Sequence, residues 1–212
     1  KASFTYGYTP PKTPELYKSQ TQKQRDTPSA ASNEGAYLGF GFGLGQSRPT
    51  GGENPITAYS MGFDGGYTAK TSSWNFWEAG LQVTSGKLGH SEADITVSSG
   101  ILAKVGYGYT ISPGLSGLSS LGAGVLVADY KNTLADNSVI KSKDSVLGSS
   151  GFLDYSLIFN TSSNVAITGG LRWTHVAFNI GQVKLENGET LKLNQAVNLN
   201  IPELKLAVRW YF

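Results

Sequence analysis

Seven charged residues stand out because each occupies the polar face of a segment that alternates with period two. Alternation of this kind places every second side chain on one face of a β-strand. Charges enclosed by such strands persist only when they are paired and hydrogen-bonded. We therefore predict one connected interior network of three acids and four bases: Asp64, Glu78, Lys104, Asp154, Arg172, Lys205 and Arg209.

The short turns implied by the sequence indicate which of these residues meet. They place Asp154 directly across from Arg172, and they make Asp64 face Glu78, with Lys104 within reach of Glu78. Such a network can fill and lock a narrow interior, or it can act as a gate. Locking is the simpler role, because eight strands leave an interior just wide enough for side chains.

Eight alternating segments are the elements that would position these residues. The clearest is residues 204–212, whose one face is apolar without a break. In residues 36–45 large apolar residues alternate with glycine, which suits a narrow interior. In the fourth segment we expect Val97 on the outer face and Ser98 on the inner face. The segments are residues 36–45, 56–68, 74–84, 95–109, 120–129, 150–160, 165–180 and 204–212.

Composition narrows the class of protein further. Hydrophobic residues make up 39% of the 212 residues and charged residues only 15%, and no stretch approaches the length of a transmembrane helix. An α-helical membrane protein is therefore excluded, but alternating strands hide a lipid-facing surface from average hydropathy. The absence of cysteine excludes thiol chemistry and zinc–thiolate sites. The small net charge of +2 gives no indication of nucleic-acid binding.

The connections between the segments alternate in length. Long polar stretches follow the odd-numbered segments, and short turns follow the even-numbered ones. Long loops on one rim and short turns on the other are typical of outer-membrane barrels. The long stretches are residues 46–55, 84–93, 129–148 and 181–200, and the short turns are residues 69–73, 112–117 and 161–164.

Aromatic residues gather near the ends of segments that would lie beside the short turns. Amphipathic rings favour the level of the lipid headgroups. We therefore expect an interfacial ring of aromatic side chains on the outer surface: Trp77, Tyr107, Tyr109, Phe159, Trp210 and Phe212.

Residues 36–212 resemble a small bacterial outer-membrane β-barrel of the OmpA, OmpX or OmpW kind, although no motif selects one family. The resemblance implies an all-β fold, a single-chain eight-stranded antiparallel transmembrane β-barrel over residues 35–212, in the bacterial outer membrane. It also implies contact with outer-membrane lipid and lipopolysaccharide. An aromatic end such as Phe212 resembles the signature read by the barrel-assembly machinery. Residues 1–34 are polar and without period, which favours a periplasmic N-terminal extension.

Catalytic and metal-binding patterns are weak in this chain. His175-Val176-Ala177 resembles the His-x-Ser of barrel lipid-A deacylases, but alanine stands where the nucleophilic serine belongs. The run from His90 to Asp94 is a loose polar cluster of the kind common in loops. We therefore expect no enzyme activity, no cofactor and no metal.

Two functions follow from the resemblance. The first is a porin-like or channel-like protein with a narrow lumen filled by side chains and gated passage of small solutes or ions. The alternative is a non-conducting structural or surface-interaction barrel that acts through its extracellular loops; a lipid-modifying enzyme is less favoured. A homo-oligomer is compatible with either function.

The last long connection carries a turn signal of its own. Asn187-Gly188 is flanked by alternating residues, and this dipeptide favours a two-residue type I′ turn. Pairing about this turn sets Leu171 opposite Leu204 and Ile167 opposite Val208. We expect a hairpin that continues past the membrane, with a bulge or break near Pro202, which lacks a ladder donor.

Overall fold

The computed structural model describes residues 34–47, 56–89, 93–133, 139–142, 145–184 and 188–212. The expected N-terminal extension lies outside these residues, apart from Glu34. Among the described residues, no helix is long and apolar enough to span a membrane.

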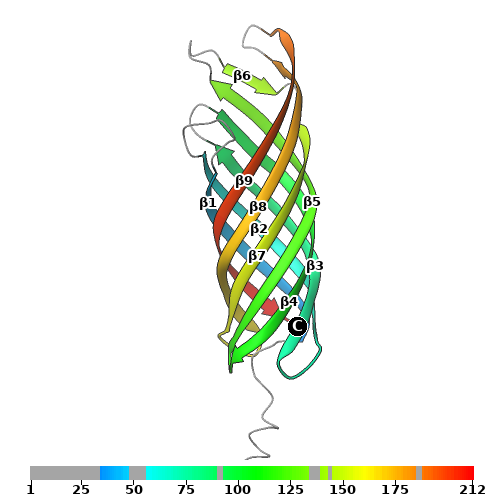
Figure 1. Cartoon of the computed structure of the whole chain (residues 1–212), viewed down its shortest axis with the longest axis vertical. Coiled ribbons are helices and arrows are strands. Elements are labelled where there is room, and N and C mark those ends of the chain that lie inside the picture. The colour runs from blue at the N-terminus through cyan, green and yellow to red at the C-terminus, as the bar shows by residue number, and fades with distance from the viewer. Residues whose placement is uncertain (1–33, 48–55, 90–92, 134–138, 143–144, 185–187) are drawn as a thin grey trace, which may run out of the picture.

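Eight antiparallel strands form a closed barrel, and a short ninth strand, β6, lies above it (Figure 1). The eight strands of the ring pair in chain order, with β5 pairing directly with β7, and β1 pairs with β9 to close the ring. Strand β6 pairs with the upper ends of β5 and β8. The predicted eight-stranded architecture is therefore confirmed. The strands are β1 (Gly35–Ser47), β2 (Ile56–Lys70), β3 (Asn75–Gly89), β4 (Ala93–Ser112), β5 (Leu115–Thr133), β6 (Val139–Ser142), β7 (Val146–Asn160), β8 (Val165–Lys184) and β9 (Thr190–Tyr211).

The long connections predicted on one rim are largely strand. Strand β3 runs to Gly89 and β4 starts at Ala93, where a loop over residues 84–93 was expected. Strands β8 and β9 likewise extend through most of residues 181–200. Many polar side chains of these stretches are exposed to water above the membrane, so polarity alone did not mark the stretches as strand.

A belt of large apolar side chains surrounds the lower part of the barrel. Phe63 is 65% exposed, Leu171 is 64% exposed and Leu204 is 67% exposed, all on the outer face. A soluble monomer rarely exposes a continuous apolar surface of this size, whereas a transmembrane barrel requires one. The barrel therefore spans a membrane through this belt.

Above the belt, the polarity of the two faces is inverted. On β8 the outward residues change from Leu171 and Trp173 to His175, while the buried inward residues become Val176 and Phe178. The upper part is thus built like a soluble barrel, with an apolar inside and a polar outside. We call its buried side chains the upper apolar cluster: Ala58, Val97, Leu102, Leu126, Ala128, Phe152, Val176, Phe178, Leu199 and Ile201.

The inversion gives a matched pair of substitutions on adjacent residues. Val176→Asp is expected to lower the free energy of unfolding by about 3 to 5 kcal/mol, because it buries an unpaired charge. His175→Asp faces outward and is expected to change that free energy by no more than about 0.5 kcal/mol. Urea unfolding in lipid vesicles, followed by tryptophan fluorescence, measures both. Equal losses for the two variants would contradict the inversion.

A β-bulge in β4 reverses the orientation that the sequence predicts for Val97 and Ser98. Val97 is buried inside the barrel, and Ser98 is exposed outside. The register with β5 shifts between Val97 and Ser99. One extra residue in a strand moves all residues beyond it to the opposite face. The prediction of Val97 outside and Ser98 inside was wrong for this reason.

The hairpin of β8 and β9 continues past the membrane as predicted. Leu171 lies opposite Leu204 and Ile167 opposite Val208. The ladder continues up to the pair Lys184 and Thr190. The predicted turn at Asn187-Gly188 lies in part outside the described residues, because Asn187 is not among them.

The irregularity in this hairpin lies away from Pro202, which pairs regularly with Trp173. The register instead shifts between Ile180 and Gln182, opposite Asn194. Asn194 has a φ of 44°, in the left-handed region that asparagine tolerates. The extra residue on β9 is therefore at Asn194, above the position expected for the bulge.

Candidate functional site

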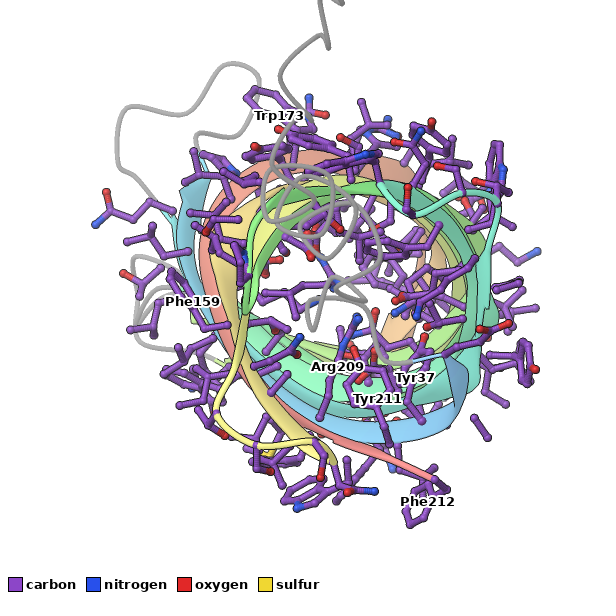
Figure 2. All side chains as sticks on the ribbon, turned by 90° about the horizontal axis from the view of Figure 1, so that it is seen from below. Tyr37, Phe159, Trp173, Arg209, Tyr211 and Phe212 are labelled. Atoms are coloured by element: carbon purple, nitrogen blue, oxygen red, sulfur yellow. The ribbon has the colours of Figure 1, made fainter. Side chains whose placement is uncertain are left out.

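The interior of the barrel has three layers, and a second apolar cluster forms the lowest of them. Tyr37 is 1% exposed and Tyr211 is 7% exposed, and their ring centroids lie 6.0 Å apart. Viewed along the barrel, Tyr37, Tyr211 and Arg209 point inward, whereas Phe159, Trp173 and Phe212 point outward (Figure 2). The lower apolar cluster consists of Tyr37, Phe76, Leu118, Ile158, Ala166 and Tyr211.

The first group of interior charges joins four residues from four strands. Lys104 Nζ lies 2.7 Å from both Asp64 Oδ2 and Glu78 Oε1. Arg209 donates from Nη1 to Glu78 Oε2 at 2.6 Å and from Nη2 to Asp64 Oδ2 at 3.3 Å. Two acids and two bases therefore neutralise each other, and the side chain of Glu78 is fully buried.

A second group lies on the other side of the lumen. Arg172 Nη2 and Lys205 Nζ each lie 3.0 Å from Asp154 Oδ2. Ser156 also donates a hydrogen bond to Asp154. Arg172 Nη1 donates to Gln82 Oε1 at 3.2 Å, across the lumen on β3. Asp154 and Arg172 are in register, as predicted.

The groups differ from the predicted arrangement in two respects. Asp64 lies opposite Gln82 in the β2–β3 register, and Glu78 lies opposite Thr68. Asp64 and Glu78 therefore do not face each other as expected; Lys104 and Arg209 bridge them. The ion pairs among the described residues also form two groups in place of one network.

One interior acid was missed. Glu203 is 6% exposed and accepts hydrogen bonds from Ser60 Oγ at 3.3 Å and Thr174 Oγ1 at 2.9 Å. Its position on the inward face follows from the parity of Lys205 and Arg209, so the signal was present. With Glu203, the four acids equal the four bases, and this middle layer is electrically neutral.

The two charge groups occupy equivalent places in two halves of the barrel. Thr71-Ser72-Ser73 ends the β2 side of one turn, and Thr161-Ser162-Ser163 ends the β7 side of another. Both threonine hydroxyls donate to the carbonyl four residues later. Counted from these turns along the ladders, Asp64 corresponds to Asp154 and Lys104 to Lys205.

Small interior residues make room for this layer. A Cβ on Gly39 would collide with the Asp64 carboxylate and come within 3.3 Å of Arg209 Cγ. A cavity of about 50 Å³ lies between the middle layer and the upper apolar cluster, and one of about 10 Å³ lies within the middle layer. A hollow of about 1050 Å³ is lined mainly by lipid-facing side chains such as Leu121, Leu153 and Leu171, together with the inward-facing Asp154 and Arg172.

Aromatic rings connect the apolar layers to the charges. The guanidinium carbon of Arg209 lies 4.8 Å from the centroid of the Tyr37 ring in the lower cluster. That of Arg172 lies 4.1 Å from the centroid of Phe152 in the upper cluster. Cation–π contacts of this kind are strongest where water is excluded. The three layers are thus in direct contact along the barrel axis.

The aromatic residues predicted for the outer ring all point outward near the short turns. Trp77 and Tyr107 pack with ring centroids 5.0 Å apart. The hydroxyls of Tyr109 and Tyr155 are 2.8 Å apart. Trp74, in the turn, is 61% exposed and was not predicted. The exposed aromatic side chains at this level include Trp77, Tyr107, Tyr109, Phe159, Trp210 and Phe212.

The structure offers little for catalysis in its described part. His90 lies outside the described residues. The ring of His175 faces outward, with Nδ1 2.9 Å from Asn200 Oδ1. No group of three or more histidine or acidic residues in the described ranges is placed to hold a metal ion.

A closed barrel with a lipid-facing belt and an enclosed neutral charge layer defines a small outer-membrane-type β-barrel. Solved structures with a similar fold include Neisserial surface protein A, with a TM-score of 0.49 and 17% identity over 84% of this chain and 97% of that one. Ail of Yersinia pestis gives 0.47 and 16%, over 84% and 99%. OprG of Pseudomonas aeruginosa gives 0.37 and 10%, over 86% and 98%. No family model and no curated protein matches the chain.

Proposed function

We propose that this protein is a non-conducting barrel of the bacterial outer membrane that presents its extracellular part as an interaction surface. The observation that carries the proposal is the pair of apolar clusters that close the lumen above and below the charge layer. A hydrated path would have to pass both clusters. Cavities of about 50 Å³ hold one or two water molecules and no solute.

The part above the membrane favours a surface role. Strands β4, β8 and β9 have 20, 20 and 22 residues, about twice the 9 to 11 residues that a tilted strand needs to cross a membrane. Their upper halves enclose the upper apolar cluster, which makes that part a packed body with fixed outer faces. A rigid body of this kind suits recognition of a partner.

A gated passage is the second candidate, and the neutral layer of eight charges favours it. Ion pairs that exchange partners could admit an ion to the middle of the barrel. Passage would still require both apolar clusters to open. We propose that the barrel contacts outer-membrane lipid and lipopolysaccharide. We also propose that the barrel-assembly machinery inserts it through β9. Association of several copies is compatible with either function.

Current recordings in planar lipid bilayers distinguish the two candidates. We expect no stepwise current from the inserted wild-type protein, because no continuous hydrated path crosses the apolar clusters. Insertion is verified by protection of the barrel from added protease. Reproducible current steps that Arg172→Ala alters would overturn the proposal in favour of the gate.

A further inference from the structure

A groove crosses the lipid-facing belt between two rows of outward side chains. Within each row the residues are paired directly from strand to strand, so both rows follow the direction of the ladder hydrogen bonds. All of these side chains line the hollow of about 1050 Å³. The lower row, nearer the short turns, is Tyr107, Ser119, Tyr155, Leu171 and Leu204, and the upper row is Val105, Leu121, Leu153, Trp173 and Pro202.

The backbone between the two rows forms the floor of this groove. Along each strand, one inward-facing residue separates the lower row from the upper row, and these residues also border the hollow. Because side chains alternate between the two faces of a strand, the groove meets the backbone of these residues from outside. The groove is therefore open to lipid and closed to the lumen. The floor residues include Gly106, Ser120, Asp154, Arg172 and Glu203.

Aromatic rings border the groove at the end of the belt nearer the short turns. Trp77 and Tyr107 both line the hollow, and their ring centroids lie 5.0 Å apart. Ser119 follows Tyr107 in the lower row, and Tyr155 follows Ser119. A small residue thus lies between two rings, which leaves the groove accessible at this point.

A pair of tyrosine hydroxyls lies just below Ser119. The hydroxyl oxygens of Tyr109 and Tyr155 are 2.8 Å apart, although β5 separates their strands. The ring of Tyr109 reaches across β5 over Gly117, where an added Cβ would come within 2.8 Å of Tyr109 Cζ. In such a pair one hydroxyl donates to the other, so the second O–H is available to a further acceptor.

The level of this hydroxyl pair is that of a lipid headgroup. Tyr109 belongs to the exposed aromatic side chains near the short turns, and such rings favour the membrane interface. Short turns of outer-membrane barrels face the periplasm. A lipid whose headgroup lies at Tyr109 and Tyr155 therefore belongs to the periplasmic leaflet, and its acyl chains extend upward beside the groove.

We propose that the groove and the tyrosine pair bind one glycerophospholipid of the periplasmic leaflet. An acyl chain lies between the two rows, and the phosphodiester accepts a hydrogen bond from the pair of Tyr109 and Tyr155. Hydrogen bonds to a charged phosphate are stronger than those between neutral groups. The headgroup and the chain are thus held at two separate points, which distinguishes this lipid from those that surround the barrel.

Removal of the two hydroxyls tests the headgroup contact. Tyr109→Phe combined with Tyr155→Phe keeps both rings. Tyr67→Phe is the matched control, because Tyr67 is an outward tyrosine of β2, 56% exposed and away from the groove. Palmitoyl-oleoyl phosphatidylethanolamine is added to the folded full-length protein in micelles, and native mass spectrometry counts the bound lipid. We expect one lipid per wild-type barrel, at least about tenfold weaker binding by the double variant, and no change in the control.

A bulky residue at Ser119 tests the groove itself, because this change keeps both hydroxyls. The ring in Ser119→Trp would occupy the space between Tyr107 and Tyr155. Met61→Trp is the control on the lipid-facing side of β2. We expect Ser119→Trp to weaken lipid binding at least about tenfold and Met61→Trp to leave it unchanged. Protection from added protease verifies that each variant is folded.

Three results would overturn the proposal. The first is equal lipid binding by the wild type, the double tyrosine variant and Ser119→Trp, which would show only surrounding lipid. The second is a preference for lipid A over phosphatidylethanolamine, which would place the headgroup in the other leaflet. The third is a lipid-free dimer that Ser119→Trp dissociates, because a second copy would then cover the groove. None of these results depends on conductance, so failure here is distinct from failure of the proposed function.

Discussion

Replacing Arg209 with alanine is expected to lower the free energy of unfolding by about 3 to 5 kcal/mol. The guanidinium holds both Glu78 and Asp64, and its removal leaves two buried acids to share the single ammonium of Lys104. A buried charge without a partner costs far more than the pair contributes when intact. Urea unfolding in lipid vesicles measures the loss.

A double variant separates loss of charge balance from loss of packing. Arg209→Met with Glu78→Gln removes one base and one acid, so Asp64 and Lys104 still neutralise each other at 2.7 Å. We expect this variant to recover at least about half of the stability lost by Arg209→Ala, since no unpaired acid remains. If the double variant were as unstable as the single one, the loss would come from packing and not from charge.

Truncating Phe178 to alanine is expected to cost about 3 to 5 kcal/mol, although the residue lies above the membrane. Its side chain is 4% exposed, and its ring covers Gly148 so closely that a Cβ there would overlap it. The substitution leaves a cavity in the upper apolar cluster. The same urea measurement, with exchange protection of β8 amides, reports the effect.

Phe159→Ala provides the control on the neighbouring strand. Phe159 faces lipid near the short turns and is 47% exposed, so its removal should cost about 1 kcal/mol. A loss for Phe178→Ala no larger than this would mean that the upper part is not packed, and the support for a closed lumen would fall with it.

The alternation of the sequence predicts correctly, for most strands, which side chains point to lipid and which point to the interior. Leu206 outside and Lys205 inside followed from period two alone, because a one-residue error would have exposed charge to lipid. The contact between Asp154 and Arg172 could be predicted for the same reason, since a short turn sets the register of its hairpin.

The features that were missed depend on contacts between distant segments or on changes of environment. The bulge at Val97 adds one residue, which no local pattern marks. The inversion from Trp173 to Val176 lies inside the predicted strand segment 165–180, but it was not recognised because a membrane was the only environment considered. Glu203 was overlooked because it lies just below Pro202, where a break was expected.

The seam between β1 and β9 has a consequence for the order of assembly. It joins the two ends of the barrel through nine residue pairs, against thirteen between β1 and β2. Contacts between distant parts of a chain carry the largest loop-closure cost and form late. Arg209 reaches across this seam to Asp64 and Glu78. We expect the ion pairs of Arg209 to form only when β1 pairs with β9. Before this step, the barrel contains an unpaired guanidinium and two acids with too few partners. Closure of the barrel pairs all three groups, so the ion pairs stabilise the closed state.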